Sequence, residues 1–341
     1  MSEHDVVVIG ASAGGVEALV KLVSQFPANL PAAVFVVLHI PPQNRSMLPI
    51  ILSRSGPLPA VHPVDGTKIV HGHIYVAPPD HHLMLEQGYI RIIRGPKENR
   101  NRPAVDPLFR SAASVYGPKV IGIVLTGALD DGTAGLLAIK QRGGIAIVQD
   151  PAEALYTGMP QSAIDHVAVN YTLSLADIAH KVVTLVDEEV DGTMERSVPE
   201  DEEMQNELSL AKMELSRQKD DVRAGTPSEY SCPECGGVLW EIQDEKLLRF
   251  RCRVGHAFSI ESMMAEQSEA IEEAMWAALK TLEEQVSISR KLAVQAHRNG
   301  HTMVAQRFEE RQRQAEKRVD LLMTALQKSE NPLPNVLEDV V

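Results

Sequence analysis

The sequence has few cysteines, no long hydrophobic run and no basic leader segment. Its 341 residues include three cysteines, an odd number that does not fit a disulfide framework. Every stretch of 18 residues contains polar or charged side chains, so we expect no membrane insertion. The apolar residues 6–9 follow the N-terminus at once, which indicates a first strand and not a signal peptide. Together these features predict a cytoplasmic protein with reduced thiols.

Positive charge is also scarce. The chain has 33 Lys and Arg against 46 Asp and Glu, for a net charge of −13. A nucleic-acid-binding protein needs a dominant basic surface, so we expect no nucleic-acid partner. A chain of this length accommodates two or three structural units.

Apolar runs alternate with amphipathic segments over residues 1–186. The runs at 5–9, 33–39, 119–125 and 144–149 are rich in β-branched side chains, as buried parallel strands are. Residues 16–26, 107–116 and 133–142 have helical spacing, and residues 83–93 are typical of a β-hairpin. This alternation predicts a doubly wound α/β domain with a mainly parallel sheet.

The composition changes after residue 186. Residues 187–204 contain nine acidic residues and one arginine, which predicts a solvated linker over 187–229 with a short helix at 202–217. A cysteine-bearing module follows at 230–259. Residues 260–298 contain neither Gly nor Pro, and a second such run reaches residue 331. We predict a helical hairpin over 260–331 and a tail at 332–341. A simple dimerisation or scaffold element is one interpretation of the hairpin, and a homodimer would form through these helices.

The first predicted strand leads directly into a glycine-rich turn at residues 10–15. Such a turn is typical of a dinucleotide site, of a nucleophile elbow, or of a helix start capped by a serine. Ser12 replaces the middle glycine of the dinucleotide motif, and the second strand ends in His39 and not in an acidic residue. The dinucleotide interpretation is therefore the weaker one.

Three complementary polar residues, Ser12, His39 and Asp131, follow three predicted strands. Because the carboxyl ends of parallel strands meet at one edge of a sheet, we expect these side chains to lie close together. Serine, histidine and carboxylate in contact are the groups that nucleophilic hydrolysis needs. Asp130 is the alternative carboxylate, and a purely structural role for the serine and the histidine stays open.

These residues and their neighbours resemble the catalytic domain of CheB-type chemotaxis methylesterases. The resemblance covers residues 4–186 and rests on the motifs at 10–15, 39–41, 105–112, 125–132 and 149–160. It implies hydrolysis of the γ-methyl ester of glutamate on methylated chemoreceptors, with glutamine deamidation as a second activity and no catalytic cofactor. Ser12 would be the nucleophile, His39 the general base and Asp131 the orienting carboxylate. Backbone N–H groups near Ala13 and Gly14 would bind the oxyanion.

The chain departs from the family pattern at several positions. Ala13 stands where threonine is usual, Leu38 where glutamine is common, and residues 128–130 replace a more usual Met-Gly-Asn. The chain also begins at the first catalytic strand, so we expect no N-terminal receiver domain. A non-catalytic docking or scaffold protein of a chemosensory system is the alternative function.

A local excess of basic residues lies between residues 91 and 110. Its arginines are Arg91, Arg94, Arg100, Arg102 and Arg110. In an acidic protein this cluster indicates either a docking surface for an acidic receptor helix or a solvated hairpin and loop.

The three cysteines and one histidine form a metal-binding pattern. Cys232 and Cys235 make a Cys-x-x-Cys pair, and after sixteen residues Cys252 and His256 make a Cys-x-x-x-His pair. Zn²⁺ prefers four ligands of these types, and a module of about 30 residues needs such a cross-link to fold. We predict a structural zinc ribbon, similar to extensions of receiver-less CheB-like proteins, with partner contact as its role. A redox role for the first pair is the alternative.

Overall fold

The computed structural model describes residues 2–43, 46–190, 202–213, 225–244 and 247–329. The described residues up to Met263 form one compact unit, and those from Met264 onward form a second. The predicted tail at 332–341 lies outside the described residues. No described helix combines the length and the apolar character that crossing a membrane requires.

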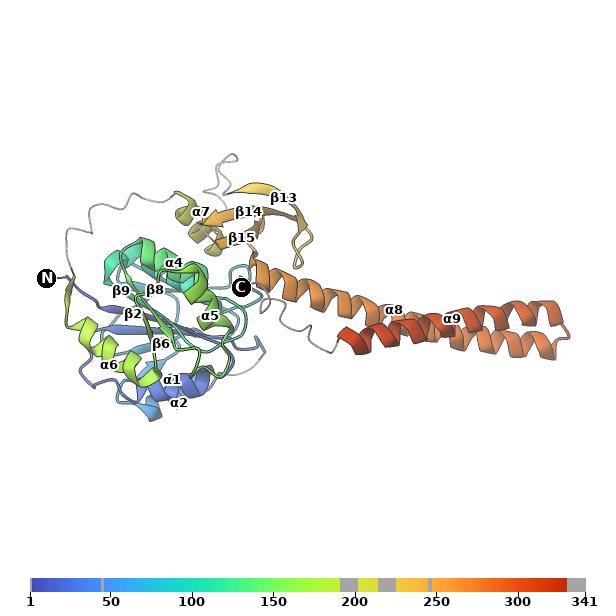
Figure 1. Cartoon of the computed structure of the whole chain (residues 1–341), viewed down its shortest axis with the longest axis horizontal. Helices are drawn as coiled ribbons and strands as arrows, with labels where there is room; N and C mark the ends of the chain where they lie inside the picture. Colours follow the sequence, from blue (N-terminus) through green and yellow to red (C-terminus); the bar gives the residue numbers. More distant parts are fainter. Residues whose placement is uncertain (1, 44–45, 191–201, 214–224, 245–246, 330–341) are drawn as a thin grey trace. The chain divides into compact units, whose positions relative to one another are not determined.

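The first unit is built on a seven-stranded parallel sheet (Figure 1). Its strand order is β11-β10-β9-β2-β3-β6-β4. In that order the strands are β11 (Tyr171–Leu173), β10 (Ile145–Gln149), β9 (Val120–Val124), β2 (Val6–Ala11), β3 (Ala33–Leu38), β6 (Ile74–Val76) and β4 (Ala60–Val61). The central strands β2, β3 and β9 are buried along their whole length, which explains their continuous apolar sequence.

Helices cover both faces of this sheet, as a doubly wound fold requires. One face packs against α1 (Gly15–Val23), α2 (Leu48–Ser55) and α6 (Leu175–Val186). The other packs against α3 (Val105–Tyr116), α4 (Thr133–Gln141) and α5 (Gly158–His166). Alternate residues of β2 divide between the two cores, with Val7 and Ile9 on the first face and Val6 and Val8 on the second. The predicted α/β fold is confirmed.

Smaller elements border the sheet. The predicted hairpin is present as β7 (His82–Glu86) and β8 (Tyr89–Ile93), and β5 (Thr67–Lys68) pairs with β8 to make a three-stranded sheet. A 3₁₀ helix spans Gly117–Lys119, and the short strands β1 (Ser2–Glu3) and β12 (Glu189–Val190) pair antiparallel.

The cysteine module is a four-stranded antiparallel sheet within the first unit. Its strands are β13 (Thr226–Ser231), β14 (Val238–Asp244), β15 (Leu247–Cys252) and β16 (Ala257–Ser259). Helix α7 (Glu202–Ala211) precedes it, inside the region predicted to be a solvated linker. The helix is not fully solvated as expected, since Met204, Glu207 and Leu208 are buried. Glu207 also contacts Arg110 and Arg249. Residues 214–217, the rest of the predicted short helix, lie outside the described residues.

The second unit is a helical hairpin, as predicted. Helix α8 (Ile260–Arg298), whose residues up to Met263 belong to the first unit, and helix α9 (Thr302–Ser329) are joined at Gly300, whose φ of 74° suits a glycine. Small side chains are buried within this unit, among them Ala293, Ala296, Ala305 and Ala315. The homodimer expected through these helices stays a prediction.

Candidate active site and metal centre

The turn after β2 places Ser12 at the carboxyl edge of the sheet. Its backbone N–H donates to the carbonyl oxygen of Thr126 at 3.0 Å, which fixes it against the loop after β9. A Cβ atom on Gly127 would lie 2.9 Å from Ser12 Cβ and 2.1 Å from Met159 Sδ, so only glycine fits beside the serine. Gly14 has φ 73° and caps α1, so the chain turns sharply from strand to helix directly after Ser12.

A chain of hydrogen bonds joins the three residues that the sequence singled out. Ser12 Oγ lies 3.1 Å from His39 Nδ1, and His39 Nε2 lies 2.7 Å from Asp131 Oδ2. A neutral imidazole with its proton on Nε2 donates to Asp131 and accepts from the Ser12 hydroxyl group. The side chain of His39 is 11% exposed and that of Asp131 is 2% exposed, so solvent reaches the histidine but not the carboxylate.

Asp131 is held by donors from three other residues. Its Oδ2 accepts from Val105 N at 2.7 Å, and its Oδ1 accepts from Asn99 Nδ2 at 3.0 Å and from Asp106 N at 3.3 Å. Val105 and Asp106 begin α3, so the carboxylate sits at the positive end of a helix. Burial by itself would raise the pKa of Asp131, but His39 and the hydrogen bonds from Val105 and Asn99 lower it below its usual value. The site therefore keeps this group ionised and oriented.

Asp130, the alternative carboxylate, faces away from this chain of contacts. Its Oδ1 accepts a hydrogen bond from Ser259 Oγ at 2.7 Å, at the end of β16. Burial and a hydrogen bond with Glu261 raise the pKa of Asp130 well above its usual value, which favours the neutral form. Of the two neighbouring aspartates, Asp131 is the one in contact with His39.

A cavity of about 330 Å³ opens beside His39. It is lined by His39, Ile40, Pro41, Pro42, Asp80, Lys97, Arg100, Asn101 and Arg102. Two of the arginines in the predicted basic cluster, Arg100 and Arg102, thus lie next to the candidate catalytic histidine. Asp80 binds Arg102 at 2.5 Å and Arg94 at 2.8 Å, so part of this charge is balanced at the cavity itself.

Arg91 and Arg110 of the cluster do not line this cavity. Arg91 pairs with Asp65 and Glu86 on the β-hairpin side. Arg110 is only 3% exposed and cannot form part of a docking surface, which corrects the prediction for this residue. Its position on α3 turns it inward, toward Glu98 and Glu207.

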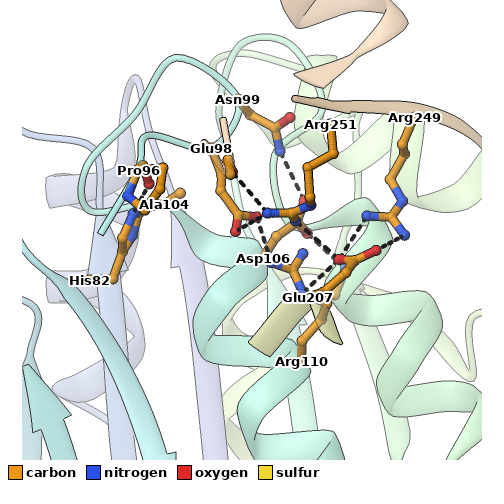
Figure 2. A network of polar contacts seen from close by, with 12 residues as sticks. His82, Pro96, Glu98, Asn99, Ala104, Asp106, Arg110, Glu207, Arg249 and Arg251 are labelled. Carbon is orange, nitrogen blue, oxygen red and sulfur yellow. Dashed lines mark hydrogen bonds and ion pairs between the residues drawn. The ribbon is translucent and has the colours of Figure 1, made fainter. Parts of the chain in front are cut away.

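Arg110 belongs to a buried network of charges, shown in Figure 2. Glu98 contacts Arg110 at 2.5 Å and Arg251 at 3.1 Å, and Glu207 on α7 contacts Arg110, Arg249 and Arg251 at 2.8–3.2 Å. Burial alone would raise the pKa of Glu98, but the Arg110 and Arg251 charges lower it to about 2. The arginines likewise lower the pKa of Glu207 far below its usual range. The network ties α7 and β15 to α3.

The four predicted metal ligands come together in the cysteine module. The ligand atoms of Cys232, Cys235, Cys252 and His256 all lie within 4.8 Å of one another. Cys235 Sγ lies 3.7 Å from Cys252 Sγ, and His256 Nδ1 lies 3.7 and 3.6 Å from the sulfurs of Cys232 and Cys252. A tetrahedron with Zn–S bonds of 2.3 Å has edges of about 3.8 Å. The donor types and spacings therefore fit a tetrahedral metal ion.

The sequence analysis did not single out Asn99 or Ser259, which contact the two aspartates. Ser259 and Ser262 stand at the start of α8, and their spacing indicates a helix N-terminus but not a contact with Asp130. Asn99 has no local pattern that distinguishes it from a loop residue.

Comparison with known proteins identifies the family of the first half of the chain. A family model described as CheB methylesterase matches residues 7–182. The protein-glutamate methylesterase/protein-glutamine glutaminase 2 of Rhizobium johnstonii is 40% identical over 182 residues, which are 52% of this chain and 50% of that protein. A putative protein-glutamate methylesterase/protein-glutamine glutaminase of Leptospira interrogans is 37% identical, over 53% of this chain and 95% of that protein.

The fold gives the same result. The crystal structure of the Thermotoga maritima CheB methylesterase catalytic domain aligns with a TM-score of 0.53 at 35% identity, and covers 55% of this chain and 100% of that one. The chain spans about half the length of the Rhizobium relative, and the match to the family model ends before the cysteine module and the helical hairpin.

Proposed function

The chain belongs to the CheB methylesterase family, as its motifs predicted, and we propose that it hydrolyses γ-methyl esters of glutamate on a methylated chemoreceptor or a related signalling protein. One observation carries the proposal. The hydrogen bonds from Ser12 to His39 and from His39 to Asp131 lie at a cavity that is open beside the imidazole. These are the contacts that a serine esterase needs.

In the first half of the reaction, His39 Nδ1 takes the proton of Ser12 Oγ as that oxygen attacks the ester carbonyl carbon. The tetrahedral intermediate then collapses. The bond to the methoxy oxygen breaks, His39 returns the proton to that oxygen, and methanol leaves. Asp131, ionised and held by four donors, stabilises the imidazolium that forms between these two proton transfers.

In the second half, water attacks the acyl group on Ser12 and gives up its proton to His39. Collapse of this intermediate returns the proton to Ser12 Oγ and releases the glutamate side chain as a carboxylic acid, which then loses its proton to water. We assign oxyanion binding to the backbone N–H groups of Ala13 and Gly14, which precede α1 and so lie at its positive end. The same steps with ammonia as the leaving group would deamidate glutamine, the second activity in the names of the relatives.

We assign substrate docking to the cavity beside His39. Arg100, Arg102 and Lys97 line it, and cationic side chains around an entrance attract an acidic receptor helix. We place this action in the cytoplasm, because a cluster of three reduced thiols persists in a reducing compartment. The alternative, a non-catalytic scaffold, has the exposed apolar side chains of α8 and α9 in its favour, among them Trp276, Ile288, Leu292 and Leu321.

The test of this function is methanol release from chemoreceptor membranes that carry methylated glutamates. We expect the full chain to release methanol and Ser12→Ala to reduce the rate to the level of a blank. His39→Gln serves as a second variant, since it removes the base and leaves Ser12 in place. A full chain that releases no methanol from several methylated receptors would contradict the proposal.

We further propose that the metal held by the cysteine module is Zn²⁺ in a structural role, since four protein ligands leave no position for substrate. The purified chain is expected to contain about one zinc per molecule by atomic absorption. Cys252→Ser should lose most of it, because the substitution removes one of the four ligands, whose sulfur lies 3.7 Å from Cys235 Sγ and 3.6 Å from His256 Nδ1. A Ser228→Ala control leaves the ligands intact and should keep the metal. Equal zinc content in both variants would refute the site.

A further inference from the structure

The structure links the cysteine module to the candidate catalytic carboxylate. We propose that Asn99 is a positioning residue for Asp131 and that the metal-bound module holds Asn99 in place, so that metal binding raises the reactivity of Ser12. This inference rests on the proposed function of Ser12, His39 and Asp131, and it assigns a role to the C-terminal module that partner contact alone does not cover.

The amide group of Asn99 bridges two buried carboxylates. Its Nδ2 donates to Asp131 Oδ1 at 3.0 Å and to Asp106 Oδ2 at 2.9 Å, and the residue is 6% exposed. Burial and the neighbouring Asp131 charge raise the pKa of Asp106 to about 7. A donor between them fixes the plane of the Asp131 carboxylate and hence the direction in which it meets His39.

The other side of Asn99 is held by the cysteine module. Its Oδ1 accepts from Ser259 N at 3.1 Å and from Ser262 Oγ at 3.3 Å. Its backbone N–H donates to Ala257 O at 2.8 Å, and Ala257 N donates to Lys97 O at 3.3 Å. Residues 97–99 therefore pair with β16 as a further strand would, and both serines are buried.

The backbone of this segment needs that support. Asn99 and Arg100 have φ values of 47° and 69°, two consecutive residues other than glycine in the left-handed region. Residues with a side chain rarely adopt this conformation, and it persists only where the surroundings fix it. Pairing with β16 is the part of those surroundings that comes from the module.

Metal ligands lie next to both contacts that the module makes with residues 97–99, the pairing with β16 and the ion pair at Lys97. His256 directly precedes β16, and Cys252 N donates to His256 O at 3.0 Å, so the ligand geometry sets where β16 begins. Glu234, between Cys232 and Cys235, binds Lys97 Nζ at 2.6 Å, and Lys97 lines the cavity beside His39. Removing the metal removes the cross-link between these two ends of the module and releases residues 97–99.

The experiment measures the rate at which a fluorophosphonate labels Ser12 in the full chain, before and after a chelator removes the metal and after zinc is returned. A second readout is the downfield proton resonance of the His39–Asp131 hydrogen bond. Asn99→Gly is the informative variant, because glycine accepts the positive φ and removes only the amide. Ser228→Ala is the matched control, since its hydroxyl group donates to Leu239 O within the module.

We expect metal removal to slow labelling of the wild type about tenfold and to shift the resonance, with recovery on adding zinc. In Asn99→Gly, labelling of Ser12 should be about tenfold slower with metal bound. Chelation should slow it by less than about a further twofold, because the amide that couples the module to Asp131 is missing. The control should behave as the wild type. If Asn99→Gly does not fold, Ser262→Ala, which removes one donor to Asn99, should show about a threefold loss and a smaller response to chelation.

The proposal is overturned by a wild type that binds no zinc, by a labelling rate and resonance that do not respond to chelation, or by equal chelator responses in the wild type and Asn99→Gly. Failure of the methylesterase activity gives a different pattern. Metal-dependent labelling of Ser12 without methanol release rejects the proposed substrate and leaves the coupling intact, whereas metal-independent methanol release rejects only the coupling.

Discussion

Asp131→Asn is expected to lower kcat for ester hydrolysis by about ten-thousandfold while the protein stays folded. The carboxylate accepts two hydrogen bonds on each oxygen, from His39 and Val105 on one and from Asn99 and Asp106 on the other. A carboxamide has a single acceptor oxygen, so one pair of donors must face an NH₂ group. If the NH₂ group faces His39, the imidazole takes the wrong tautomer; if it faces Asn99 and Asp106, the hydrogen bonds that orient the side chain at position 131 are lost.

Asp130→Asn is the matched control for this prediction. It makes the same chemical change one residue earlier, at a side chain that bonds to Ser259 and not to His39. Asparagine has the shape of a neutral aspartic acid, the form that burial favours at this position. We expect less than about a threefold change in kcat. Steady-state methanol release from methylated receptor membranes compares the two variants, and an equal loss in both would show that the carboxylate has been assigned to the wrong residue.

Glu98→Gln is expected to lower the free energy of unfolding of the first unit by about 3–5 kcal/mol. The substitution removes one of two carboxylates from the network, so Arg110 and Arg251, each 4% exposed, keep only Glu207, which they share with Arg249. Urea denaturation followed by Trp240 fluorescence in a Trp276→Phe background reports on the module that the network holds. Arg94→Gln, which breaks an exposed pair with Asp80, is the control and should change the free energy by less than about 1 kcal/mol.

The same network predicts a pH dependence. The pKa of Glu98 falls from 4.5 to about 2 in the folded protein, so its stabilising effect is fully present above about pH 4.5 and is lost as the pH falls toward 2. Between pH 5 and 2 the wild type should lose stability more steeply than Glu98→Gln. Parallel pH profiles for the two proteins would mean that the buried glutamate does not titrate with folding.

The sheet and the positions of Ser12, His39 and Asp131 could be predicted because both follow from local patterns. Fully buried strands have continuous apolar sequences, and parallel strands bring their carboxyl ends to one edge. His39 is 27 positions from Ser12 and 92 from Asp131, yet these contacts could be predicted without knowing how the loops between them fold. The cysteine spacing predicted the ligand cluster for a similar reason, since tetrahedral binding restricts the ligands to a few spacings.

The contacts between the module and the α/β domain could not be predicted. Arg251 meets Glu98 across 153 positions, and Ser259 meets Asn99 across 160, with no repeating pattern that pairs them. Arg110 illustrates the resulting error. Its basic neighbours indicated a surface cluster, but the carboxylates that draw it inward are on a loop and on α7, a helix in a segment whose acidic composition predicted a solvated linker. Composition predicts exposure only where no distant partner neutralises the charge.

The most direct test of the central claim is to trap the acyl group on Ser12. The full chain is mixed with a receptor-derived peptide that carries a glutamate γ-methyl ester, quenched in acid within the first turnover, digested and analysed by mass spectrometry. We predict that the peptide containing Ser12 gains the mass of the receptor peptide less methanol, and that methanol appears in the same amount. Methanol release with an unmodified Ser12, or undiminished release by Ser12→Ala, would contradict the account.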